Sequence, residues 1–131
     1  MNRRTVLISA LAFSVVPAMA SADFVDYRPG VIKNALAEGR TVLVDYAAKW
    51  CSTCRRQERV INALRASNPA YDSAMLFVRV DWDRYGNDRV AKDRRIPRRS
   101  TLVLLRGDQE LGRVVAQTHE PAIRALLDRG L

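Results

Sequence analysis

Two cysteines in the sequence Trp50-Cys51-Ser52-Thr53-Cys54 constrain this chain more than any other feature, and they are its only cysteines. The run before them, residues 41–46, is β-branched and apolar, which is typical of a buried strand. In the run after them, residues 55–66, Ile61 and Leu64 form one apolar stripe of a helix. The pattern therefore predicts a strand–turn–helix unit, with the first cysteine at the opening of the helix.

The position of Cys51 favours redox chemistry. Free N–H groups and the positive end of the helix dipole stabilise an anion at a helix N-terminus, and here the anion would be a thiolate. Cys54, one turn further on, can close onto it, which predicts reversible thiol–disulfide exchange.

Half of a zinc site, an inert structural disulfide and a copper carrier are the alternatives for this pair. The only histidine is His119, so either metal would lack ligands, and we expect no metal and no other cofactor. A bridge across so few residues closes too small a loop to constrain the unfolded chain much. Redox exchange is the preferred interpretation.

The run from Val42 to Cys54 resembles the active-site strand and turn of the thioredoxin family. In that family an aspartate lies six residues before the first cysteine and a tryptophan immediately before it, and Asp45 and Trp50 occupy those positions. The resemblance implies an α/β fold, a three-layer α/β/α sandwich with a mixed central sheet. It also implies a thiol–disulfide oxidoreductase.

The resemblance gives the site residues their expected roles. Cys51 would be the attacking thiolate and the more exposed sulfur, and Cys54 the buried resolving thiol. Asp45 would be a partly buried carboxylate with a raised pKa, able to take the proton of Cys54; the alternative is a solvated strand-end acid. Arg79 falls where relatives often carry a basic partner for that aspartate, although a plain surface arginine fits as well. Trp50 is expected beside the sulfurs, on the surface that docks partners.

One position departs from the family, which places a cis-proline just before the threonine that opens the penultimate core strand. If this sequence is aligned with the family by its strand, Ser100 stands at the position of the proline, and Ser100 and Thr101 are expected to contact substrate. If it is aligned by its proline, Pro97 fills that role. We favour Ser100, joined by an ordinary trans peptide, since a cis bond at a non-proline residue costs about 2.5–4 kcal/mol. A backbone N–H and a hydroxyl would then face the cysteines. Arg98 and Arg99 would flank the site and help keep Cys51 ionised, unless they belong to a solvated loop.

Residues 1–20 read as a secretion signal. Arg3 and Arg4 form a positive start, residues 6–16 an apolar core, and a small-x-small pattern predicts cleavage after Ala20, or else after Ala22. The start also resembles a twin-arginine export signal, and both export routes stay open. A retained membrane anchor is the alternative.

Residues 21–131 are then predicted to form a single domain in the periplasm of a Gram-negative bacterium, where disulfides persist. The leader removes two arginines and no acid, so the formal charge falls from +8 to +6. Export argues against nucleic acid as a partner. We expect a monomer, free of the membrane after cleavage, whose basic surface steers protein thiols and disulfides and a redox donor or acceptor.

The remaining elements are expected in the order strand, helix, strand, helix, hairpin, helix. Pro69 should stop the active-site helix, and residues 84–95 should hold one short helix. Thr118 is the expected cap of the last helix, with His119 after it. The other elements are a short helix opened at Pro29–Gly30, a strand over 75–83, a hairpin with strands at 101–105 and 110–115, and a closing helix around 122–127.

The sequence thus predicts an exported thiol–disulfide oxidoreductase that acts through Cys51 and Cys54. Ser52 and Thr53 lack the histidine that helps strongly oxidising relatives stabilise their thiolate, which favours a reducing role. The alternative is a non-catalytic module of the same fold that binds a partner or delivers a metal.

Overall fold

A computed structural model describes residues 23–131, so the predicted signal segment lies outside the described residues. Within that range no helix is both long and apolar enough to cross a membrane. The elements, in chain order, are β1 (Val25–Asp26), α1 (Val31–Ala37), β2 (Thr41–Ala47), α2 (Ser52–Ser67), α3 (Ala70–Ala74), β3 (Met75–Asp81), α4 (Trp82–Tyr85), α5 (Arg89–Lys92), β4 (Thr101–Arg106), β5 (Gln109–Val115) and α6 (Glu120–Asp128).

The five strands form one mixed sheet in the order β1-β3-β2-β4-β5. The pairs β1–β3 and β2–β3 are parallel, whereas β2–β4 and β4–β5 are antiparallel. Strand β2 lies in the centre with every residue buried, as its continuous β-branched and apolar run predicts.

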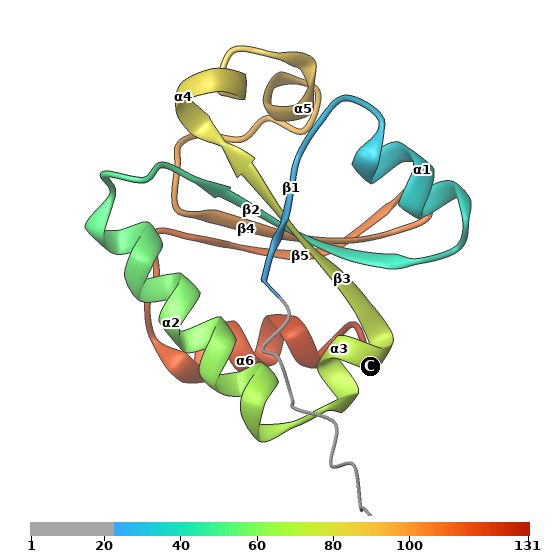
Figure 1. Ribbon diagram of the computed structural model, residues 1–131, viewed down its shortest axis with the longest axis vertical. Coiled ribbons are helices and arrows are strands. Elements are labelled where there is room, and N and C mark those ends of the chain that lie inside the picture. The colour runs from blue at the N-terminus through green and yellow to red at the C-terminus, as the bar shows by residue number, and fades with distance from the viewer. Residues whose placement is uncertain (1–22) are drawn as a thin grey trace, which may run out of the picture.

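Successive side chains of β2 point to opposite faces of the sheet, and each face packs against its own helices. Leu43 joins the core made with Ile61 of α2 and Ile123 of α6. Val42 and Val44 join the opposite core, which includes Ile32 of α1 and residues of α4 and α5. Figure 1 shows the two helical layers on either side of the sheet. The predicted three-layer α/β/α sandwich is confirmed.

The expected strand over 75–83 is too long by two residues. Strand β3 ends at Asp81, whose side chain accepts a hydrogen bond from the N–H of Asp83 (3.1 Å) and caps α4. Because an N-cap side chain satisfies a free N–H of the first turn, the chain turns into a helix at Trp82. The region 84–95 holds α5, which is the short helix expected there, and also the end of α4, which was not expected.

Two further elements differ from expectation. Helix α2 does end before Pro69, but Pro69 itself opens the short helix α3, which the sequence did not predict. The N-cap of α6 is His119 and not Thr118.

The predicted hairpin is present and its turn is tight. Arg106 pairs with Gln109, which leaves Gly107, at φ +60°, and Asp108 to make the turn. Further along, Leu104 pairs with Gly112 and Leu105 with Glu110, so β5 carries one extra residue as a bulge.

Candidate active site

The cysteine pair lies at the start of helix α2, shortly after the end of the central strand β2. Cys51 has extended backbone geometry and is the N-cap of α2, and its sulfur accepts a hydrogen bond from the N–H of Cys54 (3.1 Å). The two residues form a disulfide, with their Cα atoms 5.3 Å apart. A sulfur at a helix N-terminus, already accepting a backbone N–H, is placed to carry negative charge once the bond is reduced.

Both cysteines are buried in this disulfide form. Cys51 is 3% exposed and Cys54 is 2% exposed, so the two residues hardly differ in this form, and the greater exposure expected of the Cys51 sulfur stays a prediction. The reason for the burial is the packing of Ala47, Ala48 and Trp82 around both residues.

Asp45 lies on β2, two residues before Ala47 and therefore on the same face of the sheet as α2. It is 0% exposed, where the sequence predicted partial burial, and neither carboxylate oxygen has a hydrogen-bond partner. Burial raises the pKa of Asp45 from 3.8 to about 7. The positive charge of Arg79 lowers this pKa and the negative charge of Glu58 raises it, but burial has the largest effect. A carboxyl group with a pKa near neutrality can accept a proton and return it under physiological conditions.

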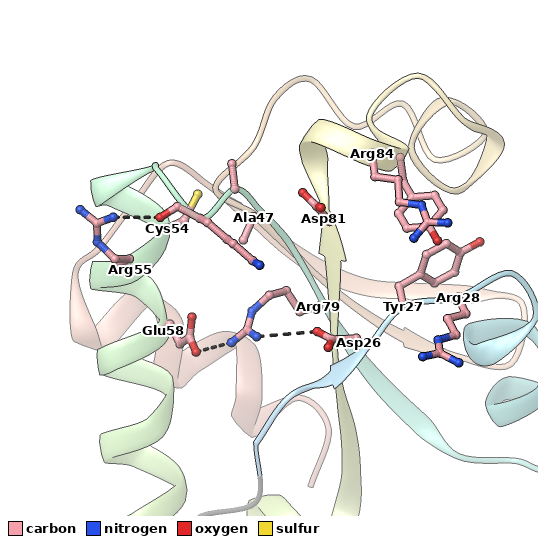
Figure 2. A pocket seen from close by; sticks show the side chains of 13 residues that line it. Asp26, Tyr27, Arg28, Ala47, Cys54, Arg55, Glu58, Arg79, Asp81 and Arg84 are labelled. Carbon is pink, nitrogen blue, oxygen red and sulfur yellow. Dashed lines mark hydrogen bonds and ion pairs between the residues drawn. The ribbon is translucent and has the colours of Figure 1, made fainter.

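Arg79 forms no ion pair with Asp45, the partner that the family resemblance suggested as one of two possibilities. It is the β3 neighbour of Asp45 in the sheet, but its guanidinium pairs with Glu58 of α2 and lies 3.9 Å from Asp26 of β1. Figure 2 shows the side chain reaching between these two acids. While it pairs with these two acids, the Arg79 side chain stays about one-third exposed to solvent. Pairing with the fully buried Asp45 would instead bury the guanidinium charge, which costs free energy of hydration.

A cavity of about 490 Å³ adjoins Cys54, between α2 and strands β1 and β3 (Figure 2). Its lining includes Lys49, Arg55 and Arg84 as well as the Arg79–Glu58 pair. No three His, Cys, Asp or Glu side chains in residues 23–131 converge as metal ligands would.

Ser100 faces the disulfide from the loop before β4. Its hydroxyl oxygen lies 3.2 Å from the sulfur of Cys51 and 3.0 Å from that of Cys54. Pro97 is exposed and contributes nothing to this contact, and residues 23–131 contain no cis peptide bond. The predicted hydroxyl therefore faces the sulfurs, but the predicted free N–H does not, because it donates to the carbonyl of Tyr46 (2.7 Å).

The residues around Ser100 are also engaged in internal hydrogen bonds. Thr101 is buried and its hydroxyl donates to the carbonyl of Arg98 (2.7 Å). Neither Ser52, which is exposed, nor Thr53, which is half-buried, makes a side-chain hydrogen bond in the described structure.

The tryptophan that packs against the two cysteines is Trp82 and not Trp50. Trp50 is 58% exposed. Its indole N–H donates to the carboxylate of Asp83 (3.0 and 3.1 Å to the two oxygens), and the guanidinium of Arg99 lies 4.2 Å from its ring centroid. Trp50 therefore presents an exposed aromatic surface at the residue before Cys51, and its docking role stays a prediction.

Three further residues belong to the site although the sequence did not predict them: Gln57, Glu58 and Trp82. Gln57 and Glu58 follow Cys54 by three and four residues on α2, so helical spacing alone places them on the cysteine side of the helix. Gln57 is fully buried, and its amide nitrogen donates to the carbonyls of Ser100 (3.0 Å) and Gln117 (2.9 Å). A glutamine among apolar residues of a buried stripe was the available signal.

Comparisons with known proteins agree with this geometry. A family model described as Thioredoxin matches residues 27–129. Thioredoxin H2-1 of Oryza sativa subsp. japonica is 32% identical over 76 residues, which is 58% of this chain and 51% of that protein, so the chain spans about half its length. Thioredoxin-1 of Saccharomyces cerevisiae is 29% identical over 82 residues, 63% of this chain and 74% of that protein. The crystal structure of Trxlp from Edwardsiella tarda has a TM-score of 0.69 at 33% identity, covering 79% of this chain and 97% of that chain.

Proposed function

Because this chain belongs to the thioredoxin family, we propose that it exchanges disulfides with protein substrates in the periplasm, in the reducing direction. The family and the Cys51–Cys54 pair support a thiol–disulfide oxidoreductase.

The observation that carries the activity is the disulfide at the N-terminus of α2 with a buried acid of near-neutral pKa on the adjoining strand. In the reduced protein the Cys51 thiolate attacks one sulfur of a partner disulfide. The partner bond breaks, a bond to Cys51 forms, and the released partner sulfur takes a proton from water.

The second step regenerates the disulfide seen in the structure. Cys54 gives its proton to the Asp45 carboxylate and attacks the sulfur of Cys51. The bond to the partner breaks, and its second sulfur leaves as a thiolate. Overall the protein dithiol loses two electrons and the partner disulfide gains them.

The reducing direction rests on Ser52 and Thr53. Neither can supply the imidazolium that would stabilise the reduced form, and stabilisation of the reduced form is what makes a dithiol pair a strong oxidant. An upstream donor of electrons is then required to return the protein to its dithiol form. We propose that the working form is a monomer.

Export to the periplasm is supported by the start of the sequence, where Arg3 and Arg4 precede an apolar run and a small-x-small motif. Expression of the full chain in a Gram-negative bacterium, followed by fractionation and N-terminal sequencing, should give a periplasmic protein that begins after residue 20. An uncut protein in the cytoplasm would refute the assignment.

The decisive experiment is reduction of a protein disulfide by the purified protein, with Cys51→Ser and Cys54→Ser as controls. We expect turnover only for the wild type, and a trapped mixed disulfide for Cys54→Ser, since that variant can attack but cannot resolve. Equilibration with glutathione gives the direction: a potential near −270 mV supports a reductant, whereas one near −120 mV indicates an oxidant. Equal behaviour of all three proteins would end the enzymatic proposal in favour of a binding module.

A further inference from the structure

We propose that Ser100 is a catalytic residue: its hydroxyl donates a hydrogen bond to whichever of the two cysteine sulfurs carries negative charge during exchange. The proposal deepens the function proposed above, and it rests on that function. It assigns a chemical role to the position at which this chain departs from the family pattern.

The direction of the hydrogen bond follows from the chemistry of the partners. Neither sulfur of a disulfide carries a proton, so the hydroxyl of Ser100 is the only possible donor between the three atoms. At 3.2 Å from Cys51 and 3.0 Å from Cys54, one rotation of the O–H bond reaches either sulfur. Ser100 is fully buried, so water does not compete for this hydrogen bond.

The hydroxyl is held in place by the backbone of Ser100. Its N–H donates to Tyr46 (2.7 Å), and its carbonyl accepts from the N–H of Ala116 (2.8 Å) and the amide of Gln57 (3.0 Å). These bonds keep Ser100 at φ +63°, a left-handed conformation that residues with a side chain rarely adopt. The surrounding structure therefore fixes a serine, in a strained conformation, where its side chain meets both sulfurs.

Gln57 is the positioning residue in this arrangement. It is fully buried, its amide nitrogen bridges the carbonyls of Ser100 and Gln117, and its amide oxygen has no hydrogen-bond partner. Leaving a buried acceptor unpaired is unfavourable, so the bridge is retained at an energetic cost to the fold. The bridge fixes the loop that carries Ser100 against the helix that carries both cysteines.

The hydroxyl can follow the charge through the reaction. Before attack the negative charge is on Cys51, and in the resolving step it is on Cys54. A hydrogen bond to an ionised group is about twice as strong as one between neutral groups, so the donor stabilises each thiolate in turn. No bond to Ser100 forms or breaks, and the electron and proton balance of the exchange is unchanged.

The test measures the rate of alkylation of reduced Cys51 by iodoacetamide as a function of pH, for wild type, Ser100→Ala and Ser100→Gly. Both variants lack the hydroxyl, but glycine accepts φ +63° without strain, so the pair separates the hydroxyl from the backbone. We expect both variants to reach half-maximal rate at a pH about one unit higher than the wild type. At pH 6 this is roughly a tenfold slower reaction.

The redox equilibrium provides a second measurement. Without the donor the reduced form is less stable, so the equilibrium with glutathione should move up to about tenfold toward the disulfide, which is roughly 30 mV more negative. Ser73→Ala, which removes an exposed hydroxyl of α3 that bonds only Pro69, should match the wild type in both assays.

The outcomes separate this inference from the proposed function. If wild type turns over and both Ser100 variants keep its alkylation profile and redox equilibrium, Ser100 has no catalytic role. A shift in Ser100→Ala alone would assign the effect to backbone strain and would equally overturn the inference. If the wild type itself shows no turnover, the proposed function is refuted instead. Gln57→Leu, which removes the bridge, should move the alkylation profile in the same direction by a smaller amount; an unmoved profile would refute its positioning role.

Discussion

Replacing Asp45 with asparagine should stabilise the oxidised protein in neutral and alkaline solution but not in acid. Asp45 is fully buried and its carboxylate has no hydrogen-bond partner, so the ionised form is penalised by the loss of its hydration. Asparagine has nearly the shape of the protonated acid and never ionises. The substitution therefore removes the penalty and leaves the packing almost unchanged.

The size of this change in stability and the pH range over which it occurs follow from the pKa of Asp45. That pKa is about 7 in the folded protein, against an ordinary value of 3.8. Below pH 3.8 both states hold the proton and the group has no effect. Between 3.8 and 7 the folded state binds more protons than the unfolded state, so stability falls as the pH rises. At 1.36 kcal/mol for each pH unit between the two values, the loss reaches about 4 kcal/mol above pH 7.

Urea denaturation of the oxidised wild type and Asp45→Asn at pH 4 and pH 8 measures this difference. The free energy of unfolding of the variant, relative to wild type, should rise by up to about 4 kcal/mol between the two pH values. Asp108→Asn removes an acid from the exposed hairpin turn and should follow the wild type. If Asp45→Asn also follows the wild type across this range, then Asp45 does not titrate abnormally and the account of its burial is wrong.

Two other substitutions test the charges around the core. Glu58→Gln removes a negative charge that raises the pKa of Asp45, and it also releases Arg79, whose positive charge lowers that pKa. The loss of stability between pH 4 and pH 8 should therefore become smaller than in the wild type. An unchanged or larger loss in the same urea titration would contradict this. Asp72→Asn leaves the buried guanidinium of Arg65, now bonded through Nε at 2.6 Å, without its anion, and should reduce the free energy of unfolding by about 1–3 kcal/mol. A change below about 0.5 kcal/mol, typical of surface substitutions, would mean that the rings of Phe24 and Phe77, whose centroids lie 5.6 and 4.1 Å from the Arg65 guanidinium, suffice to hold it.

The long elements could be predicted from the sequence because their burial patterns repeat. The continuous apolar run of β2 and the stripe of α2 were sufficient to place Cys51 at a helix N-terminus. Helices α3, α4 and α5 have four or five residues each, which is barely more than one turn and too short to show a periodic pattern. Asp81 caps α4 with its side chain, and this local bond, more than any hydrophobic pattern, ends β3.

The contacts of long side chains could not be predicted, because they depend on elements far apart in the sequence. Arg79 had the right register beside Asp45, but Glu58, one helical turn beyond Cys54, offered a partner with access to solvent. For a similar reason Trp82, for which the sequence predicted no role, packs beside the cysteines in place of Trp50. The indole N–H of Trp50 donates to the carboxylate of Asp83, and this bond holds Trp50 at the surface.

The extra residue in β5 has a consequence for self-association. An edge strand presents unpaired N–H and C=O groups on which a strand from another molecule can extend the sheet. Here one edge is β1, only two residues long, and at the other the bulge near Leu111 interrupts the regular spacing while Glu110 and Arg113 add charge. Neither edge offers a long, straight and uncharged row of backbone groups, so the sheet is protected at both ends against intermolecular β-pairing and the aggregation that follows from it.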